Sequence, residues 1–120
     1  MSYLAVFIGG GLGSLIRWRF SDWIPSTGGF PWATFSANLA ASIVLALAAL
    51  YFTKKPESPA PFALLIMTGF CGGFSTFSTF SLETFRMLDA GQWLMALAYT
   101  LGSVGVCVLA IGLVFWLGKS

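Results

Sequence analysis

The sequence predicts an all-α membrane protein with four transmembrane helices, and two observations support that prediction. The 120 residues are 58% hydrophobic and only 8% charged, with a mean hydropathy of +0.87. A soluble chain is about 25% charged, so lipid is the expected solvent for much of this one. A membrane helix needs about 20 residues, so about four of them with short turns account for residues 1–120 as a single domain.

Four apolar segments separated by helix-breaking residues define the expected spans. These spans cover residues 3–20, 32–52, 61–87 and 93–117. Glycine and proline interrupt helices, and both are concentrated in the connectors. The breakers are Pro25, Gly28, Gly29 and Pro31, then three prolines between Lys54 and Pro61, then Asp89, Ala90 and Gly91.

The third span contains a second helix-breaking signal. Gly72 and Gly73 precede a run of Phe, Ser and Thr that extends to Ser81. Each glycine costs about 1 kcal/mol relative to alanine in a helix, so a break is expected near residues 72–76. In a membrane, non-helical backbone lies buried in protein or lines a cavity, and its released carbonyl groups bind cations.

Composition excludes several classes of function. The chain has no histidine, which removes the commonest catalytic base and metal ligand. It has no glycine-rich phosphate loop followed by lysine, and a net charge of +2 is too small to indicate a nucleic-acid partner. We therefore expect neither an enzyme nor an organic cofactor. Cys71 and Cys107 lie in apolar segments and are interpreted as small packing residues.

The basic residues are balanced between the two expected sides of the membrane. Arg17, Arg19 and Arg86 fall on one side, and Lys54, Lys55 and Lys119 fall on the other. The positive-inside rule then gives almost no preferred orientation. This balance indicates insertion in both orientations and an inverted pair as the working unit. The alternative is a chain oriented by its partners or by its N-terminal amine.

Few polar side chains lie at membrane depth, where burying a charged side chain costs at least about 2.5 kcal/mol. Arg17 and Arg19 lie about one turn from the expected interface, where they either extend to water or serve a function. Glu83 and Arg86, at i and i+3, are expected to pair. Asn38 lies in an apolar span, so its amide either bonds a neighbouring helix or lines a pathway.

Phe77 and Phe80 are spaced to share one helix face, beside the hydroxyl groups of Ser78, Thr79 and Ser81. Aromatic ring edges carry partial positive charge, and hydroxyl and amide groups donate hydrogen bonds. Such a set suits a small anion, because no fixed charge would trap it. Rings of acidic or basic residues, which line many ion pores, are absent from the sequence.

At these positions the chain resembles the CrcB/Fluc family of fluoride-specific channels, which are antiparallel, dual-topology homodimers. The resemblance covers almost the whole chain and is most specific in the string from Gly69 to Ser81. The other matching positions are Arg17-Trp18, Asn38, Glu83, Tyr99 and Ser103. It implies a passive, multi-pass channel in a bacterial cell membrane that exports cytoplasmic fluoride and relieves its toxicity.

The resemblance also implies roles for individual residues. In each of two pores, Phe77 and Phe80 would form an aromatic box beside Asn38, with hydroxyl groups from Ser78, Thr79 and Ser81. Tyr99 and Ser103 would continue the path as a polar track, and Cys107 stands where some relatives have a serine of that track. Carbonyl groups of Gly72 and Ser75 from both subunits would hold a central structural Na⁺. Arg17 and Glu83 match family positions without an assigned role.

Two other classes of protein compete with this interpretation. A small multidrug-resistance-type proton antiporter also has four spans, but it needs a titratable carboxylate, for which Glu83 is the only candidate. A membrane assembly subunit without transport would use the small-residue spacings Gly9/Gly13 and Gly69/Gly73 for packing alone. The Phe-Ser-Thr repeat and Asn38 argue against that class.

Overall fold

The structure, a computed structural model, describes residues 1–25 and 28–119, and these residues are helical with short connections. The prediction of an all-α protein is confirmed. The elements are α1 (Ser2–Trp23), α2 (Trp32–Lys54), α3 (Ala60–Ala63), the π-helix η1 (Leu64–Cys71), α4 (Gly72–Phe74), α5 (Ser78–Asp89) and α6 (Trp93–Gly118). Each of the four expected segments corresponds to one helix or to one continuous series of helices.

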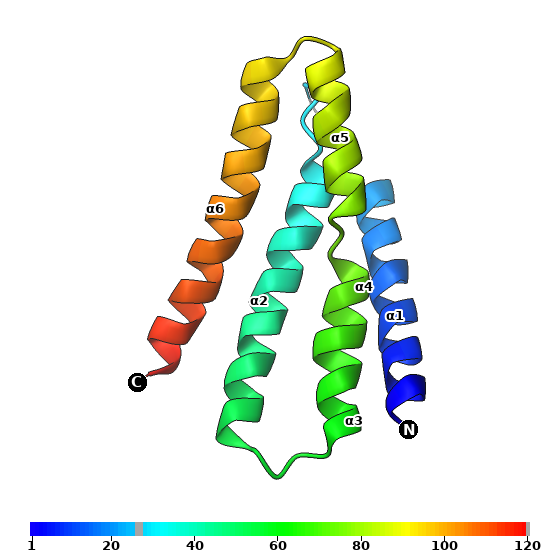
Figure 1. Ribbon diagram of the computed structural model, residues 1–120, viewed down its shortest axis with the longest axis vertical. Helices are drawn as coiled ribbons and strands as arrows, with labels where there is room; N and C mark the ends of the chain where they lie inside the picture. The colour runs from blue at the N-terminus through cyan, green and yellow to red at the C-terminus, as the bar shows by residue number, and fades with distance from the viewer. Residues whose placement is uncertain (26–27, 120) are drawn as a thin grey trace.

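The elements form four columns that alternate in direction (Figure 1). The segments α3, η1, α4 and α5 together make the third column. The start of α1, the end of α6 and the α2–α3 connection lie at one end of the molecule, and the α5–α6 turn lies at the other. Gly91 closes that turn with a φ of +78°, a conformation that favours glycine. The C-terminal ends of α1 and α5 thus point toward one side of the molecule, and those of α2 and α6 point toward the other. The count of basic residues on the two sides assumed this arrangement.

Three of the columns are long and apolar enough to cross a membrane, among the residues that the structure describes. They are α2, the column from Ala60 to Asp89, and α6. Helix α1 is not among them, because Arg17, Arg19 and Asp22 lie in its last two turns and four glycines reduce its apolar surface. Its role as a fourth span therefore stays a prediction.

The break in the third column lies at residues 75–77, within and just beyond the range expected from the sequence. Ser75 is extended, with φ −81° and ψ 158°, and helix resumes at Ser78. Gly72 and Gly73 lie just before the break and are themselves helical in α4. Gly73 also permits a close approach, since a Cβ there would lie 3.0 Å from the Cα of Gly10 in α1.

Glycines on both helices bring α1 against η1 and α4. Gly9 and Gly13 are buried, and a Cβ on Gly13 would lie 2.7 Å from the main-chain nitrogen of Phe74 and overlap the carbonyl of Phe70. The two backbones are therefore in direct contact, as in other small-residue membrane helix pairs. This contact places the C-terminal half of α1 beside the break.

The outer faces of the helices are strongly apolar. Phe7, Leu94 and Leu109 are among the large apolar side chains that are more than two-thirds exposed, at 78%, 83% and 73%. Exposing such a surface to water costs free energy, whereas contact with lipid or with a second protein surface does not.

Candidate functional site

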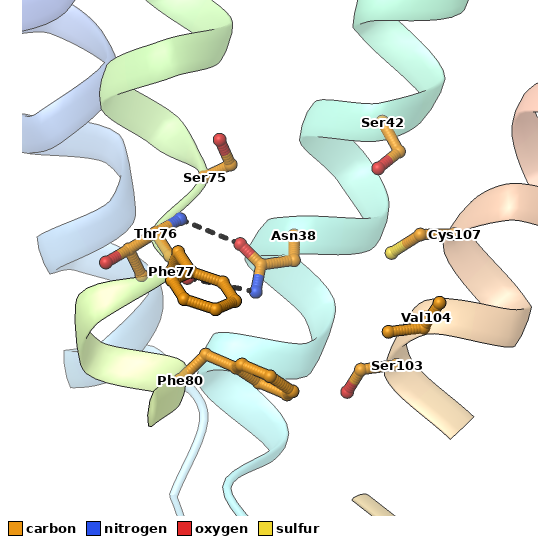
Figure 2. Close-up of a pocket in the computed structure, with 9 residues that line it drawn as sticks. All are labelled: Asn38, Ser42, Ser75, Thr76, Phe77, Phe80, Ser103, Val104 and Cys107. Atoms are coloured by element: carbon orange, nitrogen blue, oxygen red, sulfur yellow. Dashed lines mark hydrogen bonds between the residues drawn. The ribbon is translucent and has the colours of Figure 1, made fainter. Parts of the chain in front are cut away.

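A pocket of about 260 Å³ lies beside the break, between α2, the third column and α6. We call it the aromatic pocket. Its lining residues are Asn38, Ser42, Ser75, Thr76, Phe77, Phe80, Ser103, Val104 and Cys107. Figure 2 shows Asn38 and Phe80 on one side, with Ser103 and Cys107 of α6 facing them. The lining has amide, hydroxyl, thiol and aromatic groups but no charged side chain.

The two phenylalanines of the expected aromatic box lie side by side in this pocket. The ring centroids of Phe77 and Phe80 are 6.0 Å apart, and Phe80 also lies 4.9 Å from the ring of Tyr99 on α6. Phe80 is partly buried, whereas Phe77 is 79% exposed. The pocket is therefore walled by the chain on the Phe80 side and open beside Phe77.

Asn38 holds the broken backbone with both ends of its amide. Its Oδ1 accepts a hydrogen bond from the main-chain N–H of Thr76 at 2.9 Å, and its Nδ2 donates to the carbonyl of Thr76 at 3.4 Å. These bonds replace partners that the backbone loses when the helix stops. Of the two interpretations of Asn38, the bond between helices is thus present, and the amide also lines the aromatic pocket.

A second pocket, of about 210 Å³, lies on the α1 side of the break. We call it the arginine pocket. It is lined by Arg17, Ser21, Ile24, Pro31, Ala33, Thr34, Thr76, Thr79 and Glu83. Arg17 donates from Nε to the carbonyl of Gly73 at 3.1 Å, so this side chain turns toward the protein. Arg19, by contrast, is exposed and pairs with Asp22 at 3.2 Å.

Glu83 bridges two helices and does not pair with Arg86. Its carboxylate accepts hydrogen bonds from Thr34 of α2 at 3.0 Å and from the Tyr99 hydroxyl of α6 at 2.8 Å. The expected ion pair between Glu83 and Arg86 is wrong, since the only ion pair in the described part of the chain is Arg19–Asp22. The donors on α2 and α6 lie on the inner side of α5, whereas Arg86 is exposed.

The predicted polar residues are only partly brought together. Ser103 lines the aromatic pocket and Thr79 lines the arginine pocket. Ser78 and Ser81 are exposed and line neither pocket. Tyr99 is fully buried and meets the aromatic pocket only through its contact with Phe80.

Ser103 has an unusual environment. It is 5% exposed, and its Oγ is a buried polar side-chain atom without a hydrogen-bond partner among the described residues. A buried hydroxyl without a partner costs about 1–3 kcal/mol. A ligand that accepts a hydrogen bond in the aromatic pocket would remove that cost.

The break leaves unpaired the two carbonyl groups that the family resemblance implies as ligands of Na⁺. In a continuous helix the carbonyl of Gly72 would accept from the N–H of Thr76, but that N–H donates to Asn38. Within the described chain, no donor reaches the carbonyl of Gly72 or of Ser75. Both residues line a further small pocket, so their free oxygens fit a hard cation.

Sequence reasoning missed Thr34, Ser42 and Thr76. Thr34 and Ser42 lie one turn before and one turn after Asn38 on the same face of α2. Helical spacing from Asn38 could therefore have identified both. Thr76 belongs to the Phe-Ser-Thr string, but only the fold shows that it lines both pockets.

The chain is similar to the proteins of one family over almost its whole length. Residues 4–118 match the family model described as CrcB-like protein, Camphor Resistance (CrcB). A relative from Serratia proteamaculans (strain 568), named fluoride-specific ion channel FluC, is 43% identical over 97% of this chain and 95% of its own length. A protein of the same name from Bordetella petrii is 43% identical over 94% and 89%.

A more distant relative from Hydrogenobaculum sp. (strain Y04AAS1), also named fluoride-specific ion channel FluC, is 36% identical over 93% of this chain and 94% of its own. These names agree with the expectation of a channel and not an enzyme. The three apolar columns and the extent of the family match together identify a multi-pass membrane protein. With a match from residue 4 to residue 118 and relatives of this identity, the chain belongs to the CrcB family.

Proposed function

We propose that this chain is a passive, fluoride-selective channel that works as an antiparallel homodimer with two pores. The observation that carries the proposal is the aromatic pocket, where Phe77 and Phe80 lie beside the Asn38 amide and the unpartnered hydroxyl of Ser103. The names of the relatives supply the identity of the anion.

The lining of the aromatic pocket accounts for the passage of a small anion. Fluoride leaves water at a high cost, which hydrogen-bond donors and positive ring edges offset. Asn38 and Ser103 are among the donors that line the pocket, and Phe77 and Phe80 supply the ring edges. Because no fixed positive charge lies in the pocket, the ion is not trapped.

A second copy completes the pocket in this proposal. Phe77 is 79% exposed and the pocket is open on its side, so a partner surface there would close each pore. Ser78 and Ser81, which are also exposed, would contribute hydroxyl groups on the face that the partner covers. The equal numbers of basic residues at the two ends favour an inverted partner.

The free carbonyl groups of Gly72 and Ser75 support a structural Na⁺ at the centre of the dimer. Two carbonyl oxygens from each subunit would give a set of hard oxygen ligands without an acidic residue. When bound, the ion would fix the break in both subunits.

Export needs no energy source of its own. HF enters a cell uncharged and dissociates inside, and an inside-negative potential drives the anion outward with about 2.3 kcal/mol per 100 mV. A selective passive pore in the cell membrane would therefore relieve fluoride toxicity. Tyr99 and Ser103 on α6 would extend the path on the side of the aromatic pocket. Thr79 and Arg17 would line it on the side of the arginine pocket.

The proton-antiporter alternative is not favoured. It would rely on Glu83, whose carboxylate is already engaged by Thr34 and Tyr99. A carboxylate that holds three helices together through two donors is poorly placed to exchange protons with a substrate pathway.

Efflux from liposomes that contain the purified protein tests the proposal. We expect rapid, voltage-driven loss of fluoride without loss of chloride, measured with ion-selective electrodes. Phe80→Ile should abolish it, whereas Phe85→Ile should not, because Phe85 is 62% exposed and lines neither pocket. Absence of flux, or proton-coupled efflux of an organic cation, would contradict the proposal.

A further inference from the structure

The aromatic pocket and the arginine pocket have one lining residue in common, which is Thr76. The arginine pocket lies among α1, α2 and α5, and the aromatic pocket among α2, the third column and α6. Thr76 lies in the break between α4 and α5. This is the only non-helical stretch of the third column in the described residues, so an ion that passes between the pockets would meet this residue.

The two pockets contact different parts of Thr76. In Figure 2 its main-chain nitrogen points toward Asn38, whereas its hydroxyl points away from the aromatic pocket, toward the side where α1 lies. The hydrogen bonds to Asn38, at 2.9 and 3.4 Å, fix the main chain. The two bonds from Asn38 therefore hold Thr76 between the two pockets and leave its hydroxyl free of Asn38.

The proton of that hydroxyl is available. One lone pair of Thr76 Oγ1 accepts from the N–H of Thr79 at 3.3 Å, and a hydroxyl has one proton and a second lone pair to spare. Its other contact is with Ser78 Oγ at 3.4 Å, which is long for an O–H···O bond. A small anion would compete well for this proton, because a bond to a charged acceptor is roughly twice as strong.

Arg17 supplies hydrogen-bond donors for an anion on the arginine side of this hydroxyl. Its side chain lines the same pocket, and among the described residues its one bond to the protein is from Nε to the carbonyl of Gly73. The Glu83 carboxylate also lines this pocket, and it accepts hydrogen bonds from Thr34 and Tyr99. The arginine pocket thus offers an anion the remaining guanidinium N–H donors of Arg17 on the approach to Thr76.

We propose that Thr76 is the transfer point of the pathway, where its hydroxyl binds fluoride as the ion passes between the arginine pocket and the aromatic pocket. This inference rests on the proposed fluoride channel. It gives Thr76 a direct role in binding the ion, and it gives Asn38 a second role, which is to hold Thr76 in place.

Thr76→Val tests the proposal, because valine keeps the shape and removes the hydroxyl. We expect the rate of fluoride efflux to fall about tenfold or more, because the ion loses one hydrogen bond. The fluoride concentration that gives half of the maximal rate should rise. Thr76→Ser should restore most of the rate. Thr84→Val is the matched control, since in the described part of the chain the Thr84 hydroxyl bonds only to the carbonyl of Phe80 in its own helix.

A second experiment does not depend on the folding of the valine variant. Thr76→Cys is made in a Cys107→Ser background, because Cys107 also lines the aromatic pocket, and the assembled protein is then treated with a negatively charged thiol reagent. We expect the reagent to stop efflux in this variant and not in Cys107→Ser alone, in which Cys71 is buried. If the wild type conducts fluoride and the valine variant, or the modified cysteine variant, conducts equally well, Thr76 is not the transfer point. A wild type without fluoride efflux would instead refute the channel itself.

Discussion

Asn38 on α2 forms two hydrogen bonds with the main chain of Thr76, one at each end of its amide. This clasp pairs the main-chain N–H and carbonyl group of Thr76 at the point where a membrane helix stops and restarts. Asn38→Ala should remove both bonds and lower the free energy of unfolding by about 1–3 kcal/mol, together with loss of fluoride efflux. Ser36→Ala, on the same helix but outside both pockets, should leave both unchanged. Unfolding in a denaturing detergent and liposome efflux measure the two effects.

Gly13 on α1 should tolerate a side chain much less well than Gly11 does. A Cβ there would meet the backbone of Phe70 and Phe74, and overpacking typically costs about 1–3 kcal/mol. Gly11 has open space around its Cα, so Gly11→Ala should be neutral or stabilise the helix by about 0.5–1 kcal/mol. Equal unfolding free energies for the two alanine variants would contradict the packing of α1 on η1.

The sequence alone predicted the helices well and the site less well. Apolar length and breakers located all four columns within a few residues, because lipid demands long, internally bonded helices. The expected pairing of Glu83 with Arg86 failed because spacing along a helix does not reveal Thr34 and Tyr99 on its neighbours. The glycines at 72 and 73 were interpreted as breakers, whereas the close approach of Gly73 to Gly10 of α1 depends on tertiary packing that no local pattern encodes.

Glu83 should act mainly as an acceptor. Glu83→Gln keeps a carbonyl oxygen for Thr34 or Tyr99, whereas Glu83→Leu leaves both hydroxyl groups without a partner, although Thr34 is 7% exposed and Tyr99 0%. Each unpaired buried hydroxyl costs about 1–3 kcal/mol. We therefore expect Glu83→Leu to unfold far more easily than Glu83→Gln, and the glutamine variant to retain fluoride efflux. Transport that is driven by a proton gradient and lost in Glu83→Gln would favour the antiporter alternative.

Arg17 and Arg19 should differ sharply in function, although they are two residues apart. Arg17 lines the arginine pocket and binds the carbonyl of Gly73, whereas Arg19 forms an exposed pair with Asp22. Exposed pairs contribute only about 0–1 kcal/mol. Arg17→Met should slow fluoride efflux about tenfold or more, by the loss of a charged donor, and Arg19→Met should not. The result is checked from initial rates at several fluoride concentrations, and equal rates would remove Arg17 from the pathway.

Ser103 allows stability and transport to be separated. Its hydroxyl is buried without a partner in the described protein, so Ser103→Ala removes no hydrogen bond within the chain. The free energy of unfolding should stay constant or rise by about 1 kcal/mol, since the cost of burying an unpaired polar group disappears. Fluoride efflux should nevertheless fall, because the ion loses a donor in the aromatic pocket. Ser21→Ala, which loses an exposed bond to the carbonyl of Trp18 on its own helix, is the comparison for stability. A drop in stability for Ser103→Ala without a change in efflux would show that the hydroxyl has a structural role and does not bind the ion.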